Sequence, residues 1–326
     1  MNRLLTLFLW ALSLMSLTAE RPAIILVIGA PGTEAYGKQF QAWATQWEKA
    51  AVKGGATIRA IGEWKRQEPS GPTKTKLRQI IENQLRKSPH PLWIVLIGHG
   101  TYDGKTARFN LAGPDLSADE LDAWLKDFKR PLAILNCAAA SAPFLPALSN
   151  PNRVVLTATR SGFEANFCRL GAYLPNALLD PAADLDKDNQ VSLLEAWLTA
   201  ARRTAEFYKT EGRLATEHSL LDDNADAKGT PPGWFRGIRA TRQAEDAALP
   251  DGLRAHQLHL IPSETEKNLP PQIRTQRNDL ELKLARLRTQ KDSLNEDEYY
   301  QELEPLLLQL ARLYQTPDKP ASPDPD

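Results

Sequence analysis

Two residues that can do covalent chemistry follow apolar stretches of this chain. His99 comes directly after "LWIVLIG" (residues 92–98), and Cys137 comes directly after "PLAILN" (residues 131–136). Continuously apolar stretches of this length are typical of strands buried on both faces of a parallel sheet. Because ligands of such sheets bind at the carboxyl ends of the strands, we expect both side chains to lie along one sheet edge.

A thiol and an imidazole at one sheet edge suit acyl transfer. A thiolate is a strong nucleophile, and a nearby imidazole raises the thiolate fraction or protonates the leaving amine. The backbone N–H groups of Gly100 and Cys137 are the candidate oxyanion donors. Three structural alternatives stand beside this interpretation: a histidine that only shapes a glycine turn, an inert buried cysteine, and a disulfide between Cys137 and Cys168, the two cysteines of the chain.

The elements that must position His99 and Cys137 form an alternating pattern. Further apolar stretches predict strands at residues 23–28, 56–62 and 153–159, and helical spacing of apolar residues predicts helices between them, at 37–52, 75–87 and 117–128. Ser117 and Glu120 form a predicted capping box at the start of the last of these helices. The pattern predicts an α/β fold with a mostly parallel sheet flanked by helices.

The order of these motifs resembles a known group. A strand followed by His99-Gly100, a strand followed by Cys137, and the stretch "TATRSGFEANF" (157–167) after a third strand resemble the caspase-fold cysteine peptidases, and among them the legumain type. The resemblance covers residues 22–220. It implies a caspase-like fold and a cysteine endopeptidase acting on a protein or peptide, with His99 and Cys137 as the dyad. Glu164 would then line the pocket that binds a basic or asparagine side chain before the scissile bond.

Two further functions are compatible with the resemblance. The legumain-type group includes transamidases, in which an amine replaces water, and the sequence does not separate the two reactions. Asn136 stands where the family has a small residue, and alanines follow Cys137 where Ser-Gly is common. These departures favour a non-catalytic caspase-fold scaffold that binds calcium. A serine hydrolase of the α/β type is disfavoured, because the chain has no Gly-x-Ser-x-Gly elbow.

The segment "DLDKDNQVSLLE" (residues 184–195) has the spacing of a twelve-residue calcium loop of the EF-hand type. Asn189 replaces the usual glycine at position six, and asparagine tolerates the left-handed conformation needed there. The alternative is an acidic helix start without a metal. A second segment, "DDNADAKG" (222–229), repeats the Asp-x-Asn-x-Asp spacing without a terminal glutamate. The expected calcium ligands are Asp184, Asp186, Asp188, Gln190 through its carbonyl, Ser192 and Glu195.

The remaining chain predicts the domain organisation. Residues 1–19 have the layout of a signal peptide, which predicts an exported protein, periplasmic or secreted, without a stable membrane span after cleavage. A caspase-like peptidase domain (20–230) precedes a loop-rich linker (231–268), in which we expect His256 and His259 to be surface residues. A helical hairpin (269–316) and a disordered tail (317–326) follow.

The hairpin carries a short heptad seam that includes Leu280, Leu284 and Leu287. It either packs on the domain or binds a protein partner. Lys plus Arg and Asp plus Glu number 40 each, so the formal net charge is zero. This balance does not indicate binding to nucleic acid.

Overall fold

The structure is a computed structural model that describes residues 20–62 and 72–314. The predicted signal peptide (1–19) and the predicted disordered tail (317–326) lie outside the described residues. None of the helices in the described ranges has both the length and the apolarity that crossing a membrane requires.

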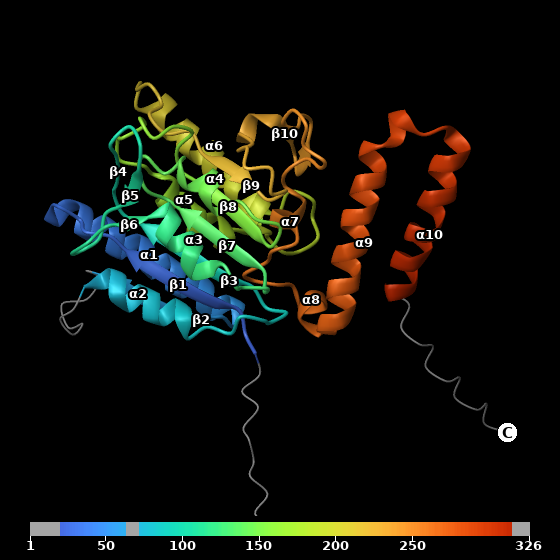
Figure 1. Cartoon of the computed structure of the whole chain (residues 1–326), viewed down its shortest axis with the longest axis horizontal. Helices are drawn as coiled ribbons and strands as arrows, with labels where there is room; N and C mark the ends of the chain where they lie inside the picture. Colours follow the sequence, from blue (N-terminus) through green and yellow to red (C-terminus); the bar gives the residue numbers. More distant parts are fainter. Residues whose placement is uncertain (1–19, 63–71, 315–326) are drawn as a thin grey trace, which may run out of the picture.

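A six-stranded sheet forms the centre of the domain (Figure 1). Its first five strands in spatial order are parallel, and β9 pairs antiparallel with β8 at one edge. The prediction of a mostly parallel sheet flanked by helices is therefore confirmed. In spatial order the strands are β2 (Thr57–Gly62), β1 (Ala23–Ile28), β3 (Leu92–Ile97), β7 (Leu132–Asn136), β8 (Arg153–Thr157) and β9 (Leu220–Asp222).

Helices cover both faces of this sheet and bury two apolar cores. One core lies under α1 (Glu34–Gly54), α5 (Leu170–Leu179) and α6 (Leu193–Thr210), and the other lies under α2 (Thr73–Glu82), α3 (Ala118–Leu125) and α4 (Phe144–Leu148). Burial on both faces explains why the central strands are apolar at every position.

Polar side chains cap the start of three of these helices. Ser117 and Glu120 form the predicted capping box of α3, and Ser192 and Glu195 form a second one at α6. Thr33 accepts a hydrogen bond from the backbone of Tyr36, so α1 begins a few residues before the predicted helix.

A small antiparallel sheet follows His99. It comprises β4 (Gly100–Tyr102), β5 (Ala107–Phe109) and β6 (Leu116–Ser117). Asp103 closes the β4–β5 turn, because its carboxylate accepts hydrogen bonds from the backbone N–H groups of Lys105 and Thr106.

Residues 231–268 are loop-rich as predicted, but they pack on the domain and are not a free linker. Ala255 and Leu260 are fully buried in the core under α1 and α6. The backbone of Leu193 also donates a hydrogen bond to the carbonyl of Leu258. This region contains η2 (Pro232–Trp234), β10 (Phe235–Arg236), β11 (Arg239–Ala240), α7 (Leu253–His256) and α8 (Glu264–Asn268).

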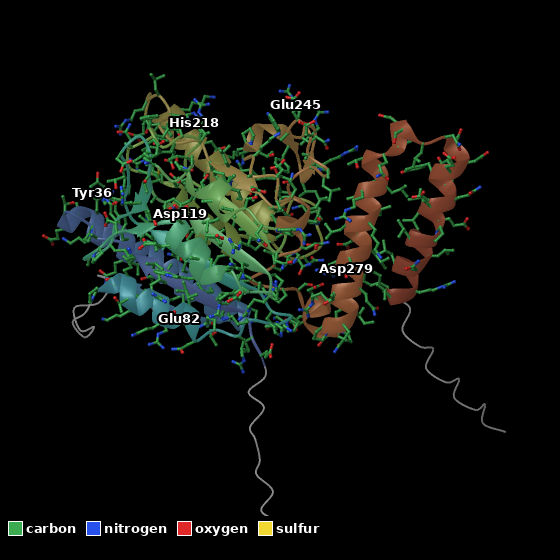
Figure 2. The ribbon with its side chains drawn as sticks, in the orientation of Figure 1. Tyr36, Glu82, Asp119, His218, Glu245 and Asp279 are labelled. Carbon is green, nitrogen blue, oxygen red and sulfur yellow. The ribbon has the colours of Figure 1, made fainter. Side chains whose placement is uncertain are left out.

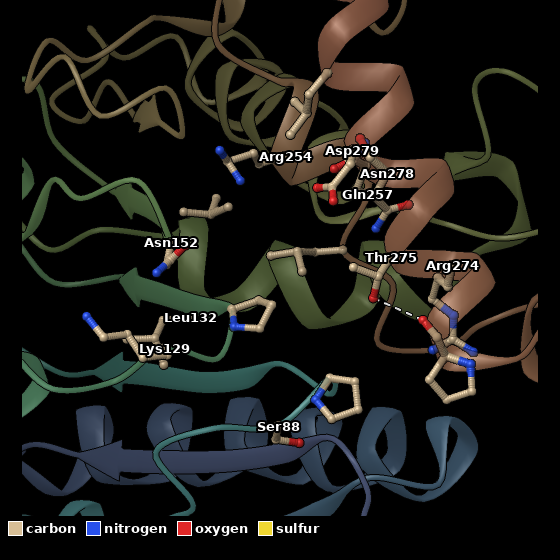
Figure 3. A pocket seen from close by; sticks show the side chains of 16 residues that line it. Ser88, Lys129, Leu132, Asn152, Arg254, Gln257, Arg274, Thr275, Asn278 and Asp279 are labelled. Atoms are coloured by element: carbon tan, nitrogen blue, oxygen red, sulfur yellow. Dashed lines mark hydrogen bonds between the residues drawn. The ribbon is translucent and has the colours of Figure 1, made fainter. Parts of the chain in front are cut away.

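The predicted helical hairpin is confirmed as α9 (Pro271–Thr289) and α10 (Glu296–Tyr314), joined through η3 (Lys291–Ser293). Its seam residues Leu280, Leu284 and Leu287 are buried. Figure 1 shows α9 next to the domain and α10 on its outer side. A cavity of about 410 Å³ separates α9 from the amino-terminal ends of β7 and β8 (Figure 3). The hairpin therefore lies at the amino-terminal ends of the strands, whereas His99 lies at their carboxyl ends.

Candidate functional site

His99 lies just beyond the carboxyl end of β3 and packs among aromatic rings. Its ring centroid is 4.7 Å from that of Tyr36, 5.3 Å from Phe40 and 5.9 Å from Phe167. Its Nε2 is 3.3 Å from the carbonyl oxygen of Pro31. Burial lowers the pKa of His99 below its ordinary value, which favours the neutral ring. Figure 2 shows Tyr36 and His218 on the side of the domain away from the hairpin, which carries Asp279.

Gly100 packs directly against the chain that follows Cys137. A Cβ atom on Gly100 would lie only 2.2 Å from the carbonyl oxygen of Ala139. No side chain fits there, so glycine is required by the close approach of two backbones. The ends of β3 and β7 meet at one edge, as expected.

Cys137 lies deeper in the sheet than His99. The β3–β7 register pairs Leu96 with Asn136, and the N–H of Cys137 donates a 3.0 Å hydrogen bond to the carbonyl of Leu96. Continuing this register puts Ala139, and not Cys137, beside His99. Two residues of strand correspond to about 6–7 Å. The N–H of Cys137, one of the two predicted oxyanion donors, is thus already bonded within the sheet.

The side chain of Cys137 is covered by packed neighbours. Only 1% of the residue is exposed, and its Cβ would be 3.1 Å from a Cβ on Gly171, which itself lies against the ring of Trp43. Burial, with a smaller contribution from the charge of Glu217, raises the pKa of Cys137 to about 12. Cys137 and Cys168 are both free, so the alternative of a disulfide between them is wrong. In this structure Cys137 is a neutral thiol in the core.

Glu164 is already engaged by other groups. Its carboxylate oxygens lie 2.6 Å from Nδ1 of His218 and 3.4 Å from Nε of Arg160, and they also accept the backbone N–H groups of both residues. The predicted role as the acid that binds a basic substrate side chain does not fit this environment. His218 is 54 positions away in the chain, so no local pattern indicates the pair.

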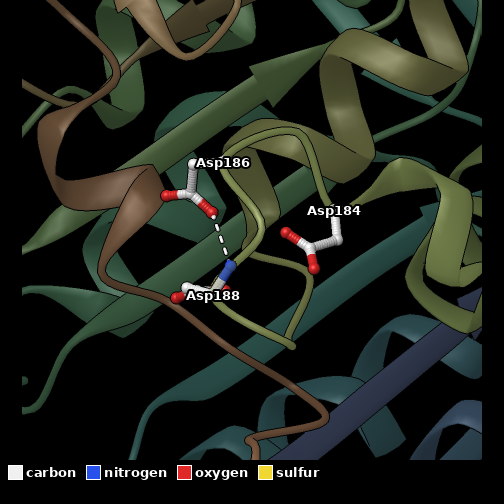
Figure 4. Close-up of side chains that lie close together, drawn as sticks. All are labelled: Asp184, Asp186 and Asp188. Atoms are coloured by element: carbon white, nitrogen blue, oxygen red, sulfur yellow. Dashed lines mark hydrogen bonds between the residues drawn. The ribbon is translucent and has the colours of Figure 1, made fainter.

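The loop 184–195 brings three of its predicted ligands together (Figure 4). Carboxylate oxygens of Asp184, Asp186 and Asp188 all lie within 4.8 Å of one another. Asn189 has a φ of 69°, so position six adopts the left-handed conformation that was expected. Burial and the charges of Glu195 and Asp188 raise the pKa of Asp186. Three oxygens at this spacing suit a hard cation such as Ca²⁺.

Two other predicted ligands have different partners. Ser192 caps α6, and one oxygen of Glu195 accepts hydrogen bonds from the backbone and hydroxyl of Ser192. The other oxygen of Glu195 accepts the N–H groups of Leu185 and Asp186. The structure therefore contains both the capped helix start and the carboxylate cluster. Gln190 binds Asp188 and the backbone of Ser263 through its side chain.

His256 and His259 are not plain surface residues as expected. Nε2 of His256 lies 3.4 Å from a carboxylate oxygen of Asp186. Nε2 of His259 is buried without a hydrogen-bond partner, and burial lowers the pKa of His259 to about 4. Both residues belong to a segment that pairs with the loop 184–195 through an isolated β-bridge between Ser192 and His259.

Comparisons with known proteins give a likeness of fold. No family model and no curated protein matches the chain. Among solved structures, the Drosophila initiator caspase Dronc is similar over 66% of this chain and 84% of its own, with a TM-score of 0.40 and 13% sequence identity. This neighbour is a caspase, and it gives no support to a legumain-type assignment. A likeness this distant says nothing about activity.

Burial predicts that neither cysteine reacts in the folded protein. With excess Ellman's reagent at pH 8, we expect close to zero modified thiols per chain before unfolding and two after unfolding in guanidinium chloride. Rapid modification of one thiol in the native protein, mapped to Cys137 by mass spectrometry, would contradict the packing described here.

The buried ring of His259 predicts a loss of stability in acid. Its folded-state pKa is below the ordinary value, so the neutral ring contributes fully above about pH 6.5, and this contribution is lost as the pH falls toward 4. Between pH 7 and pH 4.5, the free energy of unfolding of His259→Gln should fall by roughly 1–3 kcal/mol less than that of the unmodified protein. Urea titrations in EDTA measure this difference. Equal losses in both proteins would refute it.

Proposed function

We propose that this chain is a calcium-binding protein of caspase-like fold that acts by binding a partner and does not hydrolyse peptide bonds. The observation that carries the non-catalytic assignment is the burial of Cys137 beneath Trp43 and Gly171, two residues deeper than His99. The positions at the edge beside His99 and Gly100 are occupied by Ala138–Ala140, which offer no nucleophile.

The carboxylate cluster supports the calcium part of the proposal. Asp184, Asp186 and Asp188 gather negative charge at a place where Asp184 is buried. A divalent cation held by these oxygens would neutralise that charge, and the backbone carbonyl of Gln190 is available at position seven of the loop pattern. Glu195 would keep its role in orienting the loop through its hydrogen bonds to Leu185 and Asp186.

Calcium bound in the loop would act on the segment that leads to the hairpin. The loop is tied to this segment by the Leu193–Leu258 backbone bond and by the hydrogen bond from the Ser263 backbone to the side chain of Gln190. Ser263 caps α8, and α9 begins shortly afterwards. Fixing the loop therefore fixes the start of the hairpin.

The hairpin offers the surface for a partner. α10 packs against α9, and on its remaining sides Tyr300, Leu307, Leu308 and Tyr314 are about half exposed. Apolar side chains grouped on one helix in this way are typical of protein–protein contacts. This supports a scaffold that presents α10 to another protein.

A peptidase probe separates this proposal from the endopeptidase and transamidase alternatives. We expect no covalent labelling by acyloxymethyl ketone probes with Arg, Lys, Asn or Asp as recognition residue, with or without Ca²⁺, because the thiol is buried and neutral. Labelling that disappears in Cys137→Ala, falls in His99→Ala and persists in Cys168→Ala would establish a cysteine enzyme and overturn the proposal.

Calcium should stabilise the folded chain through the loop 184–195. At a hundredfold excess over the Kd, a cation that binds only the folded state adds about 2.7 kcal/mol to the free energy of unfolding. Asp188→Asn should remove this calcium-dependent gain from that loop, whereas Asp127→Asn, an exposed acid on another surface, should not. Thermal unfolding in Ca²⁺ and in EDTA measures the gain. A calcium effect unchanged in Asp188→Asn would exclude the site.

A further inference from the structure

A second loop, residues 222–228, repeats the hydrogen-bond pattern of the loop 184–195. The side chain of Asp222 accepts the N–H of Ala225, that of Asn224 accepts the N–H of Asp226, and that of Asp226 accepts the N–H of Lys228. The same steps occur from Asp184 to Lys187, from Asp186 to Asp188 and from Asp188 to Gln190. The two loops therefore orient their first, third and fifth side chains alike.

The two loops also share an uncommon backbone. Positions four and six have positive φ in both: 66° and 69° at Lys187 and Asn189, and 68° and 61° at Ala225 and Ala227. Residues other than glycine adopt this conformation rarely. The sequence pattern Asp-x-Asn-x-Asp thus encodes the same fold of the loop even though the terminal glutamate is absent.

An orphaned oxygen marks the difference between the loops. In the first loop, Oδ2 of Asp184 accepts the N–H of Asn189. In the second, the corresponding N–H of Ala227 donates to the hydroxyl of Ser149, and Oδ2 of Asp222 has no hydrogen-bond partner within the described chain. Asp222 is only 1% exposed, and burial raises the pKa of its carboxyl. The nearby Ser149 hydroxyl offsets part of this rise. A buried carboxylate oxygen without a partner is unfavourable unless a ligand satisfies it.

The surroundings of Asp222 carry further negative charge. Asp223 and Asp251 are also buried, and burial together with the charge of Asp223 raises the pKa of Asp251 to about 9. Asp223 accepts the N–H groups of Gly252 and Ala255, and Asp251 accepts those of Asp223 and Asn224, so these two acids have structural partners. Among the described residues, no lysine or arginine forms an ion pair with any acid of this group.

We propose that the loop 222–228 is a second site for a hard divalent cation of the calcium class. Oδ2 of Asp222 is the principal ligand, joined by side-chain oxygens of Asn224 and Asp226. Such a cation would hold the end of the edge strand β9 against Ser149, at the end of α4. The site is separate from the loop 184–195 and does not depend on it.

Calcium stoichiometry tests the second site. Equilibrium dialysis of the full chain against Ca²⁺ alone should give two ions per chain for the unmodified protein and one for Asp226→Asn, whose carboxylate is half buried. The double variant Asp188→Asn, Asp226→Asn should bind none. Glu245→Gln, an exposed neighbour of Lys228, is the matched control and should bind two. Asp222→Asn should lose the same ion as Asp226→Asn, and circular dichroism confirms that each variant is folded.

The outcomes separate the two sites. Two bound ions in folded Asp226→Asn would overturn the second site. One bound ion in the unmodified chain that is lost only in Asp188→Asn would also overturn the second site, and it would support the first. One bound ion that is lost only in Asp226→Asn would establish the second site and remove the first.

Discussion

Parallel pairing of β3 with β7 places Leu96 beside Asn136, and the chemistry available at the carboxyl edge of the sheet follows from this register. Side chains alternate between the two faces, so His99 and Cys137 point to the same face but emerge at different depths. The thiol enters the core under α1 and α5, while the imidazole packs among the rings of Tyr36, Phe40 and Phe167. A slip of one residue would turn Cys137 to the other face, and a slip of two would disrupt the packing of every apolar residue in β7.

The same feature that made the strands easy to predict made their register impossible to predict. β3 and β7 are buried at every position, so their sequences show no alternation of apolar and polar residues. Alternation is what ties a strand to one register when only one face is buried. The sheet, its flanking helices and the capping box at Ser117 could therefore be predicted, but the depth of Cys137 relative to His99 could not.

Distance along the chain separates the other features that could be predicted from those that could not. The loop 184–195 was predictable because its carboxylates, its left-handed Asn189 and its exit helix are neighbours in sequence. The pairing of Glu164 with His218 joins residues from opposite ends of the α5–α6 region, and the orphaned oxygen of Asp222 depends on Ser149 in a different element. Such contacts exist only once the sheet has brought these segments together, so residue spacing carries no sign of them.

In the proposed function, acidic residues and not the thiol set the character of this chain. Its overall charge is balanced, yet the loop 184–195 brings three carboxylates together, and Asp222, Asp223 and Asp251 are buried in or beside the loop 222–228. Each loop contacts a segment that is distant in sequence. A cation that binds the loops only in the folded state raises the free energy of unfolding through its own binding free energy. The loop 184–195 would stabilise the attachment of the segment before the hairpin, and the loop 222–228 would stabilise the edge strand. In this proposal calcium would control how rigidly α9 and α10 are presented, and the buried Cys137 would contribute only packing to the core.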